Sequence, residues 1–117
     1  MPQAVVIETL ERALRDRAAE GEAADVLVGI ALNCDDAEFI EHWCVQVGTR
    51  AVSGSPVLGL AGLCLGHTAR RSSFGHLSDE ALTLAKSLAA RAEADPSDVD
   101  TRAVDGYDDI RDFLHLW

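Results

Sequence analysis

The segment SPVLGLAGLCLGHTARR, residues 55–71, decides the fold that this sequence predicts. From Val57 to Leu65 it leaves no clearly polar face before His67, and a helix that is apolar all round is usually buried. Ser55 can cap the first turn of such a helix, and proline suits the position that follows a cap. The segment therefore predicts a buried central helix that begins at Pro56.

Three glycines of this segment, Gly59, Gly62 and Gly66, recur every three or four residues and so line one side of the helix. A glycine inside a helix costs about 1 kcal/mol relative to alanine. Three glycines on one side predict that the backbone of another element packs closely against them.

Apolar residues at helical spacing predict five further helices around the central one. Aromatic residues make up only 5% of the chain and alanine is plentiful, which also favours closely packed helices. We expect these helices at residues 3–19, ended by Gly21; at 22–32; from Asp36, capped by Asp35, to Gly48; from the Ser78 cap, with Asp79 and Glu80 in its first turn; and from Asp95-Pro96 onward.

The expected helix starts repeat along the chain. Starts near Asp36 and Asp79 are about 43 residues apart, and those near Pro56 and Pro96 about 40, which matches two-helix HEAT or armadillo repeats. The sequence thus predicts one all-α domain over residues 1–117, a six-helix HEAT-like α-solenoid of three antiparallel helix pairs. A compact six-helix bundle of another topology is the alternative.

The chain is strongly acidic, with 20 acidic and 10 basic residues and a net charge of -10. Such a charge opposes binding to nucleic acid or to an anionic membrane, and favours either a basic protein partner or simple solubility. Residues 77–117 hold ten of the acidic residues and four of the basic ones.

The start of the chain lacks the pattern of a secretory signal, and the apolar run 56–66 is too short to span a bilayer. The cysteines, Cys34, Cys44 and Cys64, form no CxxC pair. We therefore expect free thiols and a cytoplasmic location.

The last expected helix has the clearest pattern. At 100° per residue one side is apolar and the other acidic. The apolar side holds Val99, Ala103, Gly106, Ile110, Leu114 and Trp117, and the acidic side Asp98, Asp105, Asp108, Asp109 and Asp112. We predict partner binding through Asp105, Asp108, Asp109 and Asp112, with Glu38 and Glu41 as outlying candidates. A solvated acidic face is the alternative.

Catalytic and metal sites find little support. Cys64 and His67, three residues apart on one helix, supply only two zinc ligands. His42 and Cys44 on the neighbouring helix do not complete the site, because their side chains point about 200° apart. Cys64 sits in too apolar a helix for a nucleophile. Aspartates that diverge along a helix do not form a calcium site. We expect no enzyme activity, no metal and no cofactor.

The remaining candidates have structural interpretations. Arg70 and Arg71 form too small a basic cluster for nucleic acid and suit the carbonyl groups at a helix end. Trp43 and Trp117 are expected in the core, with a role as interface anchors as the alternative.

Two segments, GLAGLCLGHTARRSSFGHLS (59–78) and AVDGYDDIRDFL (103–114), resemble a group of short bacterial HEAT-like repeat proteins. These proteins pair a GHLAR-type central helix with an ALDDIRMFL-type C-terminal helix, and the likeness covers about residues 25–114. The matching residues are Gly66, His67 and Arg70 in the first motif, and Asp108, Asp109, Ile110, Arg111, Phe113 and Leu114 in the second. Leu58 stands where the group usually carries an arginine, and Asp112 where it carries a methionine.

The resemblance implies a helical repeat fold and supplies no catalytic residue. Many such proteins look like immunity proteins of polymorphic or contact-dependent toxin systems. Our hypothesis is an immunity protein that occludes the basic active site of a cognate toxin domain with an acidic helical surface. A HEAT-like scaffold or interaction module, in one form a homodimer, is the alternative.

Overall fold

The computed structural model describes residues 2–71 and 77–114, and within these ranges it contains six α-helices and no strand. The predicted all-α class is confirmed. The helices are α1 (Gln3–Arg15), α2 (Glu20–Asn33), α3 (Ala37–Arg50), α4 (Pro56–Arg70), α5 (Asp79–Ala94) and α6 (Arg102–Leu114).

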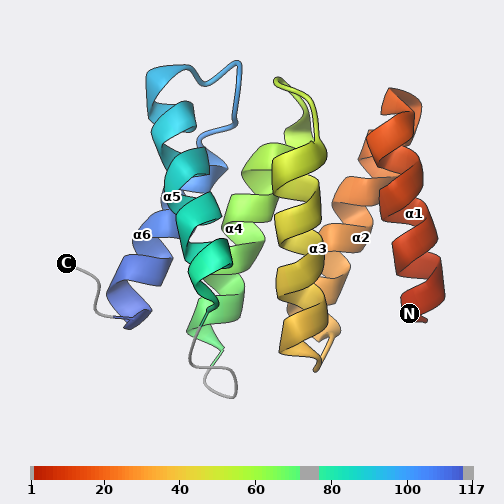
Figure 1. Ribbon diagram of the computed structural model, residues 1–117, viewed down its shortest axis with the longest axis horizontal. Helices are drawn as coiled ribbons and strands as arrows, with labels where there is room; N and C mark the ends of the chain where they lie inside the picture. Colours follow the sequence, from red (N-terminus) through yellow and green to blue (C-terminus); the bar gives the residue numbers. More distant parts are fainter. Residues whose placement is uncertain (1, 72–76, 115–117) are drawn as a thin grey trace.

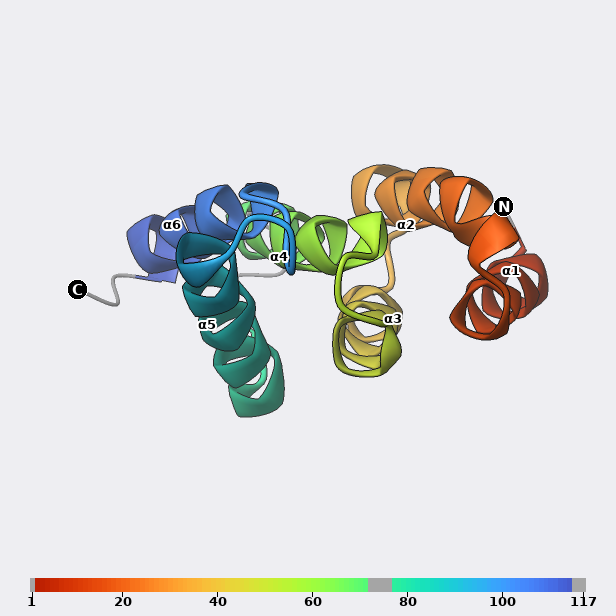
Figure 2. The ribbon, with the colours of Figure 1, turned by 90° about the horizontal axis from the view of Figure 1, so that it is seen from above.

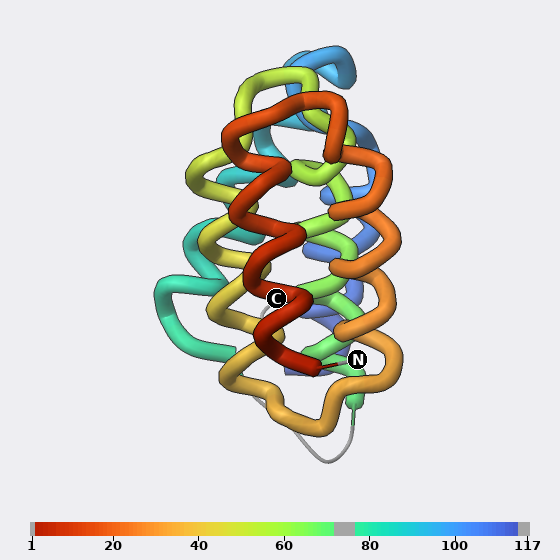
Figure 3. Tube along the Cα trace, turned by 90° about the vertical axis from the view of Figure 1, so that its right-hand side faces the viewer, coloured from red at the N-terminus to blue at the C-terminus, as the bar shows by residue number. Residues whose placement is uncertain are grey.

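The helices lie in two layers (Figures 1 and 2). One layer holds α2, α4 and α6, and the other holds α1, α3 and α5. Helix α4 contacts α2 on one side and α6 on the other, and it also packs against α3 and α5. Figure 3, viewed from the α1 end, shows α1 and α2 running side by side at the N-terminal end.

Helix α4 is the buried centre that the sequence predicts. Eleven of its fifteen residues are buried, Leu58 and Leu65 completely. Its first turn begins as expected, because the Ser55 hydroxyl accepts a hydrogen bond from the Val57 N–H and Pro56 follows the cap.

The glycines of α4 lie against the segment that leads into α6 and against α6 itself. A Cβ placed on Gly62 would lie 3.0 Å from the Ala103 Cα, and one on Gly66 would lie 2.5 Å from the Gly106 carbonyl oxygen. Glycine at these positions lets two helix backbones touch, which the spacing predicts without naming the partner helix.

The predicted boundary between the first two helices is wrong. Helix α1 ends at Arg15, and the Asp16 carboxylate accepts a hydrogen bond from the Ala18 N–H at 3.0 Å. A short 3₁₀ turn over Arg17–Ala19 then leads into α2, so Gly21 lies inside a helix instead of ending one.

The ends of α3 also differ from the expectation. Asp36, not Asp35, caps the helix, with its carboxylate accepting the Phe39 N–H at 3.1 Å. Helix α3 continues past Gly48 to Arg50. Gly48 does not end the helix but lies against Leu84 of α5, where a larger side chain would be crowded.

The predicted start of the last helix is wrong as well. Asp95 accepts hydrogen bonds from the Ser97 N–H and hydroxyl, which holds residues 95–101 in turns. The Asp100 carboxylate then accepts the Arg102 N–H at 2.9 Å, where α6 begins. The distance in sequence between the starts of α4 and α6 is therefore longer than the expected 40 or so residues. Val99, predicted on the apolar side of the last helix, is buried but precedes that helix.

Other expectations concern the core and the membrane. Trp43 is buried, as predicted, while Trp117 and the expected end of α4 near residues 72–75 lie outside the described residues. All three cysteines are free thiols. No helix in the part of the chain that the structure describes is long and apolar enough to cross a membrane.

Candidate functional site

Four of the six predicted partner-binding residues lie on α6 and two on α3, and the six do not form one surface. Asp105, Asp108 and Asp112 are exposed on the side of α6 that faces away from α4, and we call these three residues the α6 acidic edge. Glu38 and Glu41 lie on α3 in the other layer.

The carboxylates of the α6 acidic edge form no ion pair with any other described side chain. The nearest basic residues on the helix have other partners. Arg102 binds Asp100, and the Arg111 guanidinium lies 5.9 Å from the centre of the Tyr107 ring. The edge therefore carries three uncompensated negative charges on about two turns of helix.

Asp109 does not belong to this edge. It is half-buried and its carboxylate lies 3.5 Å from a guanidinium nitrogen of Arg70 on α4. The same guanidinium lies 5.5 Å from the centre of the Phe113 ring. Asp109 thus joins α6 to α4, and its charge is matched within the protein.

Asp98 lies outside α6 altogether, so its predicted place on the acidic side of that helix is wrong. The Arg91 guanidinium donates two hydrogen bonds to it at 2.7 and 2.8 Å, and the Ser53 hydroxyl donates a third. The bonds from Arg91 and then Ser53 lower the pKa of Asp98 to about 2. This carboxylate ties the end of α5 to the loop before α4.

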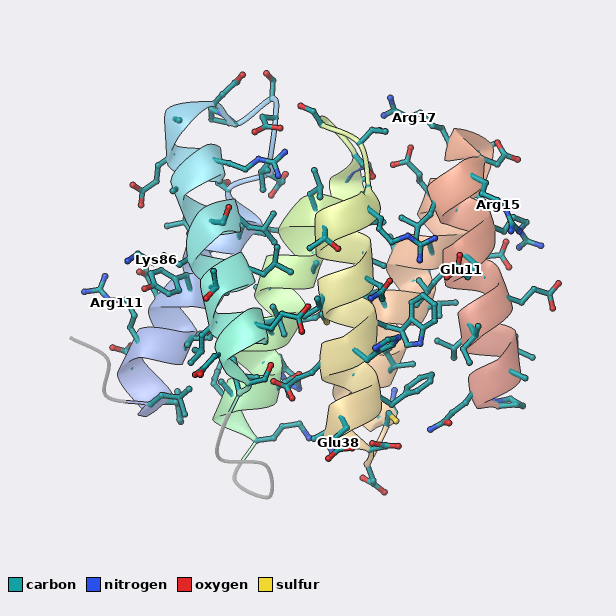
Figure 4. The ribbon with its side chains drawn as sticks, in the orientation of Figure 1. Glu11, Arg15, Arg17, Glu38, Lys86 and Arg111 are labelled. Atoms are coloured by element: carbon teal, nitrogen blue, oxygen red, sulfur yellow. The ribbon has the colours of Figure 1, made fainter. Side chains whose placement is uncertain are left out.

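Glu38 and Glu41 line a groove between α3 and α5, which we call the α3–α5 groove. Figure 4 shows Glu38 near the lower end of α3. It consists of two hollows, of about 440 and about 210 Å³, that share Val45 and Glu80. The larger is also lined by Thr49, Asp79, Thr83, Leu84 and Ser87, and the smaller by Glu38, Glu41, His42, Gln46 and Ser78.

Two contacts hold α5 beside α3. The Glu41 carboxylate accepts a hydrogen bond from the Ser78 N–H at 2.7 Å, immediately before α5. Further along, Leu84 packs on Gly48, where a Cβ would lie 2.7 Å from the Leu84 Cδ2. Glu41 therefore helps to hold the two helices together, whereas Glu38 is exposed and forms no ion pair with another described side chain.

Asp79 and Glu80 are binding candidates that the sequence did not reveal. In the sequence they have a structural explanation, because the helix dipole favours acidic residues in the first turn of a helix. They therefore give no separate signal of a binding site. Only the packing of α5 on α3 brings them to the same groove as Glu38 and Glu41.

The cysteine and arginine side chains considered above as reactive or binding groups form contacts within the fold. The Cys64 thiol donates to the Leu27 carbonyl oxygen at 3.8 Å. A hydrogen bond with Cys64, together with complete burial, raises the pKa of the Cys44 thiol. Arg71 donates to the Ala31 and Cys34 carbonyl oxygens at the end of α2. Within residues 2–71 and 77–114, no three His, Cys, Asp or Glu side chains are close enough to hold a metal ion.

These features define a small two-layer helical protein with two acidic surfaces. Comparison with known protein families, with characterised protein sequences and with solved structures gives no match.

Proposed function

We propose that the protein is an inhibitor of the immunity type, which binds a cognate toxin domain and occludes its basic active site through the α6 acidic edge. The observation that carries this proposal is the set of three exposed, uncompensated carboxylates of Asp105, Asp108 and Asp112 on one side of α6. The resemblance to short HEAT-like immunity proteins supports it from the sequence.

We further propose that the fold is a HEAT-like solenoid of three helix pairs. The separation of even-numbered and odd-numbered helices into two layers supports this (Figure 2). In a solenoid each pair packs only on its neighbours, so the last helix keeps one side uncovered. The α6 acidic edge would be that side.

A terminal helix needs a polar outer face for solubility, and a mixture of both charges would provide one. The α6 acidic edge instead presents a single sign of charge, on a protein whose net charge is -10. A field of one sign speeds encounter with a partner of the opposite sign, and a few buried side chains then set specificity. This is what an inhibitor of a basic active site requires.

The test is a pull-down with the tagged full chain from a lysate of its own cells, washed at low and then at high salt. One variant replaces the three aspartates of the α6 acidic edge by asparagine. A control variant makes the same change in charge at three exposed residues with no ion pair among the described side chains, by Glu8→Gln, Asp25→Asn and Glu93→Gln.

We expect wild type and control to retain one small basic domain in equal amounts at low salt, and the edge variant to lose it. Addition of the protein to the purified domain should abolish that domain's activity. If no basic protein is retained, or if its activity survives in the complex, the proposal is wrong.

A scaffold or homodimer is the second candidate, and one feature favours it. Leu32 on α2 and Phe113 on α6 are 55% and 51% exposed on the layer of even-numbered helices. A hollow of about 210 Å³ on this layer, lined by Val28, Leu63 and His67 among others, lies beside them. Light scattering tests this candidate, because a dimer that persists at low concentration would favour it.

A further inference from the structure

We propose that the α3–α5 groove binds an extended basic segment of a protein partner, in which lysine or arginine alternates with aliphatic residues. This inference does not depend on the α6 acidic edge, which lies on a different helix. It assigns a function to Glu38, Asp79 and Glu80, which form no ion pair with any side chain that the structure describes.

The shape of the groove suits a length of polypeptide. Its two hollows adjoin at Val45 and Glu80 and extend along α3 from Glu38 to Thr49. The eleven steps from Glu38 to Thr49 cover about 16 Å of helix, which is the length of about five residues of extended chain.

The lining of the groove is apolar on its floor and acidic at its rim. Val45 is buried and Leu84 half-buried, and the larger hollow is also lined by the hydroxyl side chains of Thr49, Thr83 and Ser87. Carboxylates come from both helices: Glu38 and Glu41 from α3, and Asp79 and Glu80 from α5. No lysine or arginine lines either hollow.

The spacing of the carboxylates favours a polymer over a single ion. No three of them lie close enough together to hold one metal ion. In an extended chain, alternate side chains point the same way and lie about 6.6 Å apart, so basic residues can meet carboxylates along the rim. The residues between them then face the floor, where aliphatic side chains can contact Val45 and Leu84.

Other occupants fit less well. Nucleic acid carries phosphates, which the carboxylates repel. A second copy of this chain carries the same net charge of -10. Most described arginines are already used within the protein, as in the pairs of Arg12 with Glu22 and Arg50 with Glu11.

The test uses the full-length protein and a fluorescein-labelled octapeptide, (Lys-Val)₄, with binding followed by fluorescence anisotropy. The control peptides are (Lys-Gly)₄, which lacks the aliphatic side chains, and (Glu-Val)₄, which reverses the charge. Amide chemical shifts measured by NMR locate the bound peptide.

We expect (Lys-Val)₄ to bind at low salt, to lose affinity as salt is added, and to shift the amides of Val45, Thr49 and Thr83. The other two peptides should bind at least tenfold more weakly. Failure of (Lys-Val)₄ to bind, or equal binding of (Lys-Gly)₄, would show that the groove is not a site for such a segment.

Matched variants separate this site from the α6 acidic edge. The pair Glu38→Gln and Glu80→Gln should weaken the peptide at least fivefold, and Thr83→Arg, which fills the groove without removing a carboxylate, should do the same. The pair Asp108→Asn and Asp112→Asn should change its affinity by less than twofold. Equal weakening by both pairs would overturn the inference but leave the proposed function standing, since that function is judged by retention of the toxin domain. Thermal melting of each variant confirms that it is folded.

Discussion

Gly106 of α6 faces the carbonyl group of Gly62 in α4 so closely that a Cβ on Gly106 would overlap that group. A Cβ on Gly62 would lie 3.0 Å from the Ala103 Cα, which is also a tight contact. The contact fixes how α6 is rotated on α4. Because Gly106 faces α4, the aspartates on the far side of α6 face outward. The position of the α6 acidic edge therefore depends on two glycines that carry no charge themselves.

The Gly106→Ala variant should lose about 3 kcal/mol of stability, since inserted atoms in a packed interface cost this much when the neighbours cannot move. Its Cβ would lie 2.8 Å from the Leu63 Cα and closer still to the Gly62 carbonyl, which are backbone atoms of a buried helix. Gly29→Ala in α2 is the control, because nothing lies within 4 Å of its Cβ position. It should gain up to about 1 kcal/mol from helix propensity. Urea denaturation measures both, and a Gly106→Ala protein as stable as wild type would contradict this packing.

Ser55 joins two helices through one hydroxyl group. It donates a hydrogen bond to the carboxylate of Glu20, whose other oxygen accepts from the Arg17 Nε at 2.8 Å. Burial raises the pKa of Glu20, but the bonds from Ser55 and Arg17 outweigh burial, and the pKa is lowered.

The Ser55→Ala variant should lose about 1–3 kcal/mol, because a buried carboxylate loses a donor and α4 loses its cap. Ser87→Ala, at an exposed serine of α5, should change stability by less than about 0.5 kcal/mol. The wild-type contribution of Glu20 is present above its ordinary pKa of 4.5 and is lost as pH falls through the lowered value. Melting curves at pH 7 test the loss, and equal melting temperatures for the two variants would rule out this role for Ser55.

Asp98 should make stability depend on pH at the acid end. Its pKa falls from 3.8 to about 2 in the folded protein, so its stabilising effect is complete above pH 4 and disappears as pH falls through about 2. Asp98→Asn should therefore lower the melting temperature at pH 7, and the difference from wild type should shrink between pH 4 and pH 2. A difference that stays constant over that range would mean that the ion pair with Arg91 does not stabilise the fold.

Much of the fold follows from local sequence signals. The Ser55–Pro56 cap predicts the start of α4, the apolar run after it predicts the burial of α4, and the glycine stripe predicts its close packing. Each of these signals lies in residues that are near one another in the sequence. Asp95-Pro96 carries a similar local signal and misleads. There the serine hydroxyl and amide of residue 97 bind Asp95 and hold a turn, and the ion pair with Arg91 keeps Asp98 out of a helix.

The candidate site could be predicted only in part. Asp105, Asp108 and Asp112 share one side of one helix, so their periodicity is enough to group them. Asp109 has the same periodicity, but Arg70 on another helix pairs with it. The α3–α5 groove joins residues as far apart as Glu38 and Ser87, and only the packing of two helices brings them together.

The α6 acidic edge should act on the rate of association more than on the lifetime of the complex. Exposed charges steer a partner from a distance and are screened by salt. With the retained toxin domain, replacing the three aspartates by asparagine should slow association about tenfold at low salt, and the effect should vanish near 1 M salt, where screening acts over about 3 Å. The Glu8→Gln, Asp25→Asn, Glu93→Gln control should slow it less than twofold. Stopped-flow fluorescence measures both rates. Equal slowing by the two variants would assign the effect to net charge alone, and a change confined to dissociation would mean that the aspartates are buried in the interface instead of steering the approach.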